Sequence, residues 1–113
     1  MQSRYTNARG EEHSSPTILC LSYFQAKPQY RDVLILELLK LVESTRAERG
    51  CIYYELFLDN EDPNFLIVAE KFVNQQALDD HEKKPYIVSF VEGPMDEYCK
   101  KVTWHVAREL KKL

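Results

Sequence analysis

The sequence predicts a single α+β domain with one antiparallel four-stranded sheet and helices on one face of it. Three observations predict this fold. The chain has 113 residues, which is the length of one domain. Four short apolar segments have the pattern of strands, and two longer segments between them have helical periodicity. Only turn-forming residues separate the middle two strands, so the expected order is β-α-β-β-α-β, the ferredoxin-like plan.

The first half of the domain is expected to contain one strand and one long helix. Residues 17–24 are short, apolar and lack a clearly polar face, so this strand should be covered on both sides. Residues 27–50 should form the helix, with Pro28 in its first position and Gly50 just past its end. The apolar stripe of this helix is broad enough to contact more than one neighbour.

The second half adds three strands and an interrupted helix. Strands are expected over residues 51–59, 65–72 and 101–109. Asn74 can cap a helix that follows the second of these strands. Pro85 should break or restart that helix, because a proline has no backbone N–H to donate.

Residues 17–109 should form this domain, between a flexible tail over residues 1–16 and a short tail over residues 110–113. With both helices on one face of the sheet, the opposite face still carries apolar residues on every strand. A large exposed apolar patch marks an interface. We therefore expect a homodimer in which two sheets face each other, which is a dimeric α+β barrel.

Composition and charge argue against several classes of function. The formal net charge of −3 and the isoelectric point of about 5.6 give no electrostatic footprint for nucleic acid or an anionic membrane. No apolar run approaches the ~20 residues of a membrane span, and the chain does not begin with an apolar signal segment. The three cysteines are odd in number and lack metal-site spacing, so we expect reduced thiols in a cytoplasmic protein.

Two ionisable residues are the candidate catalytic groups. His81 shares a helical face with Leu78, which places it at the margin of the core, and histidine titrates in the range that suits a general base. Glu70 lies on an apolar strand face beside Phe72, where an ionised carboxylate needs a partner. The alternative for His81 is a backbone cap near the helix break. For Glu70 it is an ion pair or a cap of the following helix.

Aromatic side chains are expected to wall a pocket in which a flat aromatic substrate can stack. Each of them can equally be a core or interface residue. His105 has no metal-ligand spacing, so we expect a structural or interfacial role for it. The candidate substrate-binding residues are Tyr23, Tyr54, Phe72, Tyr86, Phe90 and Trp104.

A set of residues between positions 44 and 91 has a specific order and spacing: Arg46, Glu48, Gly50, Tyr54, Glu55, Asp62, Pro63, Glu70, Ala77, Leu78, His81 and Phe90. In this order they resemble the antibiotic biosynthesis monooxygenase family, whose members are small dimeric α+β barrels with a ferredoxin-like protomer. The resemblance implies a range of activities. Some members oxidise quinols or polyketide aromatics with O₂ and no metal or flavin, and others degrade haem or modify a phosphorylated signalling sugar.

The sequence departs from the family pattern at three places. Phe72 stands where many members, including the haem-degrading ones, have Trp, and residues 86–93 lack the histidine that ligates haem iron. Both departures point away from haem chemistry. The first strand has Ser22 and Tyr23 but not the Asn that is typical of the oxygenases.

The resulting hypothesis is a cofactor-independent monooxygenase that oxidises a quinol or phenolic small molecule with O₂. His81 would be the base or hydrogen-bond partner and Glu70 its support, with no metal and no cofactor. One alternative is a non-oxidative isomerase or processing enzyme for a small polar metabolite, which Arg46 or Lys71 near the pocket mouth would favour. The other is a non-catalytic dimeric protein that binds a small ligand.

Overall fold

The computed structural model describes residues 4–6, 12–14 and 16–110. Its main feature is a four-stranded antiparallel sheet with the strand order β4-β5-β3-β6. The predicted order of strands and helices and the ferredoxin-like α+β fold are confirmed. The strands of this sheet are β3 (Ile18–Ala26), β4 (Cys51–Leu58), β5 (Phe65–Phe72) and β6 (Cys99–Arg108).

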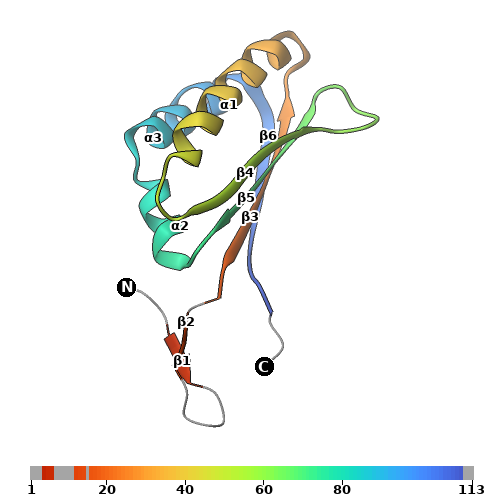
Figure 1. Cartoon of the computed structure of the whole chain (residues 1–113). Helices are drawn as coiled ribbons and strands as arrows, with labels where there is room; N and C mark the ends of the chain where they lie inside the picture. Colours follow the sequence, from red (N-terminus) through yellow and green to blue (C-terminus); the bar gives the residue numbers. More distant parts are fainter. Residues whose placement is uncertain (1–3, 7–11, 15, 111–113) are drawn as a thin grey trace.

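The helices form a second layer on one face of the sheet (Figure 1). The predicted interruption of the second helical region is confirmed, and a fourth short helix follows that the sequence did not predict. Within the described residues, no helix is long and apolar enough to cross a membrane. The helical elements are η1 (Pro28–Tyr30), α1 (Arg31–Arg46), α2 (Gln75–Glu82), α3 (Pro85–Glu92) and α4 (Pro94–Tyr98).

Strand β5 defines the face on which the helices pack. Its side chains alternate between buried and half-buried, because successive side chains of a strand point to opposite faces. Glu70 is therefore on the helix-covered face, as predicted, where it is only 6% exposed. The other β5 residues buried on this face are Leu66, Val68 and Phe72.

Helix α1 ends earlier than predicted, at Arg46, and Ala47 caps it in helical conformation. The predicted role of Gly50 as the residue just past the helix end was wrong. Gly50 instead lies against α2, where an added Cβ would be 2.4 Å from the Cβ of Ala77. Its carbonyl also accepts a hydrogen bond of 2.9 Å from the N–H of Val73. A residue without a side chain is required here because the segment after α1 touches the start of α2.

The start of α2 and the break before α3 follow the predicted signals. The Oδ1 atom of Asn74 accepts a hydrogen bond of 2.8 Å from the N–H of Ala77. Lys84 is extended, with φ −62° and ψ 137°, as is typical of a residue before proline. Pro85 then occupies the first turn of α3. Each of the two helices buries its own pair of side chains, Leu78 and His81 in α2 and Ile87 and Phe90 in α3.

The N-terminal segment contains two short strands, β1 (Arg4–Thr6) and β2 (Glu12–Ser14), which pair antiparallel. The remainder of the predicted tail up to residue 15 lies outside the described residues, as do residues 111–113. The flexible tails and the domain limits of 17–109 therefore stay predictions.

The sheet face opposite the helices is not covered by any described element (Figure 1). A row of neighbouring side chains crosses its four strands, from Phe57 through Ile67 and Tyr23 to Thr103. Phe57 is 51% exposed, and the rings of Tyr23 and Phe65 stack with their centroids 6.0 Å apart. We call this surface the outer face.

Candidate active site

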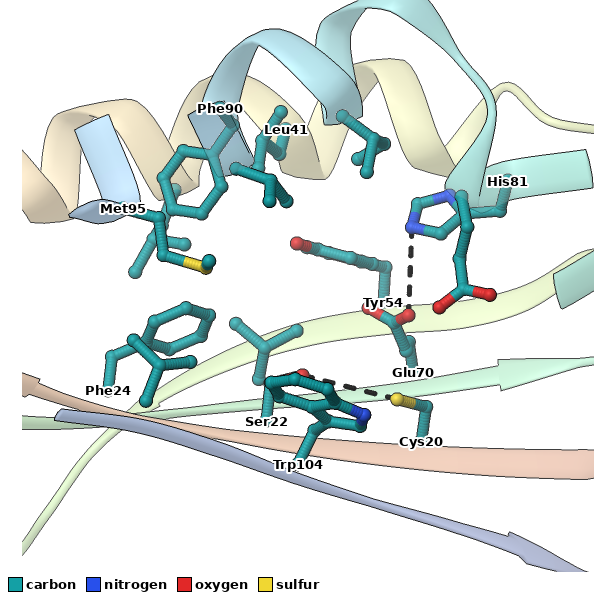
Figure 2. Close-up of a pocket in the computed structure, with 16 residues that line it drawn as sticks. Cys20, Ser22, Phe24, Leu41, Tyr54, Glu70, His81, Phe90, Met95 and Trp104 are labelled. Atoms are coloured by element: carbon teal, nitrogen blue, oxygen red, sulfur yellow. Dashed lines mark hydrogen bonds and ion pairs between the residues drawn. The ribbon is translucent and has the colours of Figure 1, made fainter. Parts of the chain in front are cut away.

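A cavity of about 310 Å³ lies between the helices and the sheet (Figure 2). This volume is at the lower end of the range for small-molecule sites. Its floor consists of two rows of residues on adjacent strands, Tyr54–Glu70–Cys20 and Val68–Ser22–Trp104. Its opposite wall consists of apolar side chains from or near the helices: Leu38, Leu41, Ile87, Phe90, Val91 and Met95.

His81 reaches this cavity from α2. Leu78, one turn earlier on the same face, is 2% exposed and fixes the orientation of the helix, and His81 itself is 3% exposed. The ring of Phe72 packs against the imidazole with the two centroids 4.9 Å apart. The imidazole does not cap the backbone, because its Nδ1 atom lies 2.9 Å and 3.1 Å from the two carboxylate oxygens of Glu48.

Glu48 is a residue of the site that was not among the predicted candidates. It lies between α1 and β4, and its side chain is only 8% exposed. Its Oε2 atom also accepts a short hydrogen bond from the hydroxyl of Tyr86 on α3. Its place among the residues that carry the family resemblance was the signal that could have identified it.

Glu70 faces the other nitrogen of the imidazole. The distance from its Oε1 atom to Nε2 of His81 is 3.6 Å, which is slightly too long for a hydrogen bond. Burial, reinforced by the carboxylates of Glu82 and Glu48, raises the pKa of Glu70 to about 8. Glu70 therefore holds its proton at neutral pH. Its predicted alternative as a helix cap does not apply, since Asn74 caps α2.

Tyr54 supplies a hydroxyl inside the cavity (Figure 2). Its side chain is 3% exposed, and among the described residues we find no hydrogen-bond partner for this hydroxyl. Burial raises the pKa of Tyr54, with the charge of Glu70 adding to the effect, so the hydroxyl remains a proton donor. A buried tyrosine hydroxyl needs a partner, and a polar atom of a ligand in the cavity can be that partner.

Cys20 and Ser22 add two weakly polar groups to the floor. The Cys20 sulfur lies 4.0 Å from the Ser22 hydroxyl oxygen (Figure 2). Burial, together with the nearby Glu70 carboxylate, raises the pKa of the Cys20 thiol to about 12. Cys20 is therefore a protonated thiol at neutral pH and a poor nucleophile.

The family model described as antibiotic biosynthesis monooxygenase matches residues 17–93, from the start of β3 through α3. The chain belongs to this family. The match includes Tyr54, Glu70 and His81, so the polar groups of the cavity lie within the family domain.

Several relatives of this antibiotic biosynthesis monooxygenase domain support the assignment. "Putative monooxygenase YcnE" of Bacillus subtilis is 30% identical over 74 residues, which cover 66% of this chain and 78% of the relative. "Uncharacterized protein sll1783" of Synechocystis is 31% identical over 83 residues, or 74% of this chain, but the chain spans only 56% of that relative. The crystal structure of protein SO0527 from Shewanella oneidensis has a TM-score of 0.82 at 30% identity, covering 85% of this chain and 93% of the other.

The cavity of this family member brings together five of the eight predicted site residues: His81, Glu70, Tyr54, Phe90 and Trp104. Trp104 is 64% exposed, because β6 is an edge strand, and it forms the rim of the cavity.

The other three predicted residues lie elsewhere. Tyr23 belongs to the outer face, since strand alternation points it away from its neighbour Ser22. Phe72 packs against the imidazole of His81, and Tyr86 hydrogen-bonds to Glu48, which in turn contacts His81. Within residues 4–6, 12–14 and 16–110, no three His, Cys, Asp or Glu side chains gather as a metal site requires.

Proposed function

We propose that this protein is a monooxygenase that oxidises an uncharged phenolic or quinol-type aromatic with O₂, the electrons coming from the substrate itself. One observation carries the proposal. A largely apolar cavity holds an imidazole nitrogen, a protonated carboxyl and a tyrosine hydroxyl that has no hydrogen-bond partner among the described residues. These groups suit the removal of a phenolic proton and the stabilisation of the resulting oxyanion.

In the proposed reaction, Nε2 of His81 takes the phenolic proton and Tyr54 donates a hydrogen bond to the phenolate. The phenolate is electron-rich enough to reduce O₂ directly in a site shielded from water. For a phenol with a free para C–H, the sum is phenol plus O₂ giving quinone plus water. One oxygen atom of O₂ becomes the new carbonyl. The other leaves as water with the hydroxyl hydrogen and the ring hydrogen, and the substrate gives up four electrons.

The charges around the cavity support an uncharged substrate over a phosphorylated or carboxylated one. The carboxylate of Glu82 lines the cavity, whereas no lysine or arginine of the described residues does. Arg46 binds the carbonyl of Tyr54 and the carboxylate of Glu55, and Lys71 pairs with Glu109 at 2.7 Å. The cations that would favour a small anionic metabolite are therefore engaged outside the cavity.

An oxygen-electrode assay tests the proposed function. We expect O₂ uptake with neutral phenols and quinols, one O₂ per substrate, and no return of O₂ when catalase is added. With ¹⁸O₂, the quinone should gain one labelled oxygen atom. Carboxylated analogues of the same ring should react at least ~10-fold more slowly, since a buried anion without a cationic partner is costly. No uptake with any neutral compound, or faster turnover of the anionic analogues, would contradict the proposal.

We also propose that the protein is a homodimer in which the outer faces of two copies pack together. The row of Phe57, Ile67 and Tyr23 supports this arrangement, because sheets pack face to face through such apolar rows. The unpaired thiols of Cys20, Cys51 and Cys99 support a reducing, cytoplasmic location.

Light scattering tests the dimer. We expect about twice the 13.3 kDa mass of the chain. Ile67→Asp, at the centre of the outer face, should shift the mass to that of a monomer. Leu36→Asp is the matched control, because Leu36 is 59% exposed on α1 in the helical layer. A monomeric unmodified protein, or dissociation by the control alone, would refute the arrangement.

A further inference from the structure

Glu48 is buried at the site without lining the cavity, and the contacts of its two oxygens define its role. We propose that Glu48 is a positioning residue that holds His81 in the tautomer protonated at Nδ1, so that Nε2 is the basic atom facing the cavity. The effect on turnover rests on the proposed function. The tautomer itself does not.

The first support is the geometry of the Glu48–His81 contact. Both carboxylate oxygens lie within hydrogen-bond distance of Nδ1, at 2.9 Å and 3.1 Å. A carboxylate can only accept, so the hydrogen between the two groups belongs to Nδ1. In a neutral imidazole the other nitrogen is then an acceptor, which is the state a general base needs.

The second support is that Glu48 is itself held in place. The hydroxyl of Tyr86 on α3 donates to the same Oε2 atom that His81 contacts. The carboxylate thereby links the segment after α1 to both α2 and α3. A buried carboxylate that Tyr86 also holds can orient the imidazole more closely than a mobile surface carboxylate can.

The third support is the space on the Nε2 side. Nε2 lies 3.6 Å from Oε1 of Glu70, too far for a direct hydrogen bond but close enough for both groups to approach one substrate oxygen. If Nε2 carried the proton instead, its N–H would point at Glu70, and the lone pair of Nδ1 would face the Glu48 carboxylate. That arrangement places two acceptors against each other and is disfavoured.

The test measures the tautomer directly by two-bond ¹H–¹⁵N NMR of the labelled, full-length protein. The His81 signals are assigned by their loss in His81→Gln, and the exposed His105 is an internal reference. We expect the unmodified protein to show His81 protonated at Nδ1. An Nε2-protonated ring in the unmodified protein overturns the proposal, whatever happens to any variant.

Three variants separate positioning from simple packing. Glu48→Leu removes the acceptor, so the ring should turn to the Nε2-protonated tautomer and kcat should fall about tenfold or more, part of the ~10²–10⁴ that a general base contributes. Glu48→Gln keeps an acceptor oxygen and should retain the Nδ1 tautomer. Glu43→Leu, an exposed position on α1, is the control and should change neither.

The outcomes also distinguish this inference from the proposed function. An unchanged tautomer in Glu48→Leu overturns the positioning role. A second outcome is that Glu48→Leu reverses the Nδ1 tautomer but the unmodified protein consumes no O₂ with any phenol. That outcome refutes the proposed function and leaves the positioning role of Glu48 intact.

Discussion

His81→Ala is expected to lower kcat/KM for a phenolic substrate by about 10²–10⁴-fold, the usual contribution of a general base. The loss should appear mainly in kcat, because the base acts on the proton in transit and contributes little to binding the aromatic ring. The measurement is O₂ consumption at saturating and limiting substrate concentrations.

Lys83→Ala is the matched control for this variant. Lys83 follows α2, is exposed and does not line the cavity, so its loss should leave turnover unchanged. Circular dichroism shows whether each variant is folded. A folded His81→Ala protein with full turnover would remove the base from the proposed mechanism.

Glu70→Gln is expected to make the protein more stable at pH 9 and to change its stability little at pH 5. The carboxyl of Glu70 has an ordinary pKa of 4.5 and a folded-state pKa of about 8, raised mainly by burial. Between these two values the folded state binds the additional proton. The free energy of unfolding therefore falls as the pH rises through this window.

The expected gain for Glu70→Gln above pH 8 is about 2–5 kcal/mol, since each pKa unit is worth roughly 1.4 kcal/mol. Urea unfolding from pH 5 to pH 9 measures it. Glu43→Gln, an exposed carboxylate on α1, should leave the slope of stability against pH unchanged. Equal slopes for Glu70→Gln and the unmodified protein would show that the Glu70 carboxyl ionises at its ordinary pH.

The sequence was informative about the fold because its local signals and its tertiary contacts agree. The alternation along β5 put Glu70 on the buried face, Asn74 marked the start of α2, and Pro85 marked the break before α3. The end of α1 was misplaced because Gly50 has two possible uses. It can terminate a helix, or it can allow a close approach to another segment, and only the position of Ala77 shows which applies.

The candidate site was harder to predict because its key contacts are distant in sequence. Glu48 and His81 are separated by 33 positions, and Tyr54 pairs with Glu70 only through the β4–β5 register. Strand alternation already separated Tyr23 from Ser22, so its placement on the outer face could have been anticipated.

Residues that carry the family resemblance pair with one another in space. Glu48 contacts His81, Gly50 lies against Ala77, and Tyr54 is the strand neighbour of Glu70. Arg46 forms an ion pair with Glu55 at 2.9 Å. The order and spacing in the sequence thus correspond to a set of contacts that join the end of α1 and the strands to α2.

The position of Trp104 has a practical consequence. The chain has a single tryptophan, and its indole is 64% exposed at the rim of the cavity. Light of a longer wavelength than tyrosine absorbs therefore excites only the indole of Trp104, which lies next to the space for a ligand. We therefore expect a ligand in the cavity to change the fluorescence of the unlabelled protein, and compounds can be ranked for affinity in this way before any of them is shown to react.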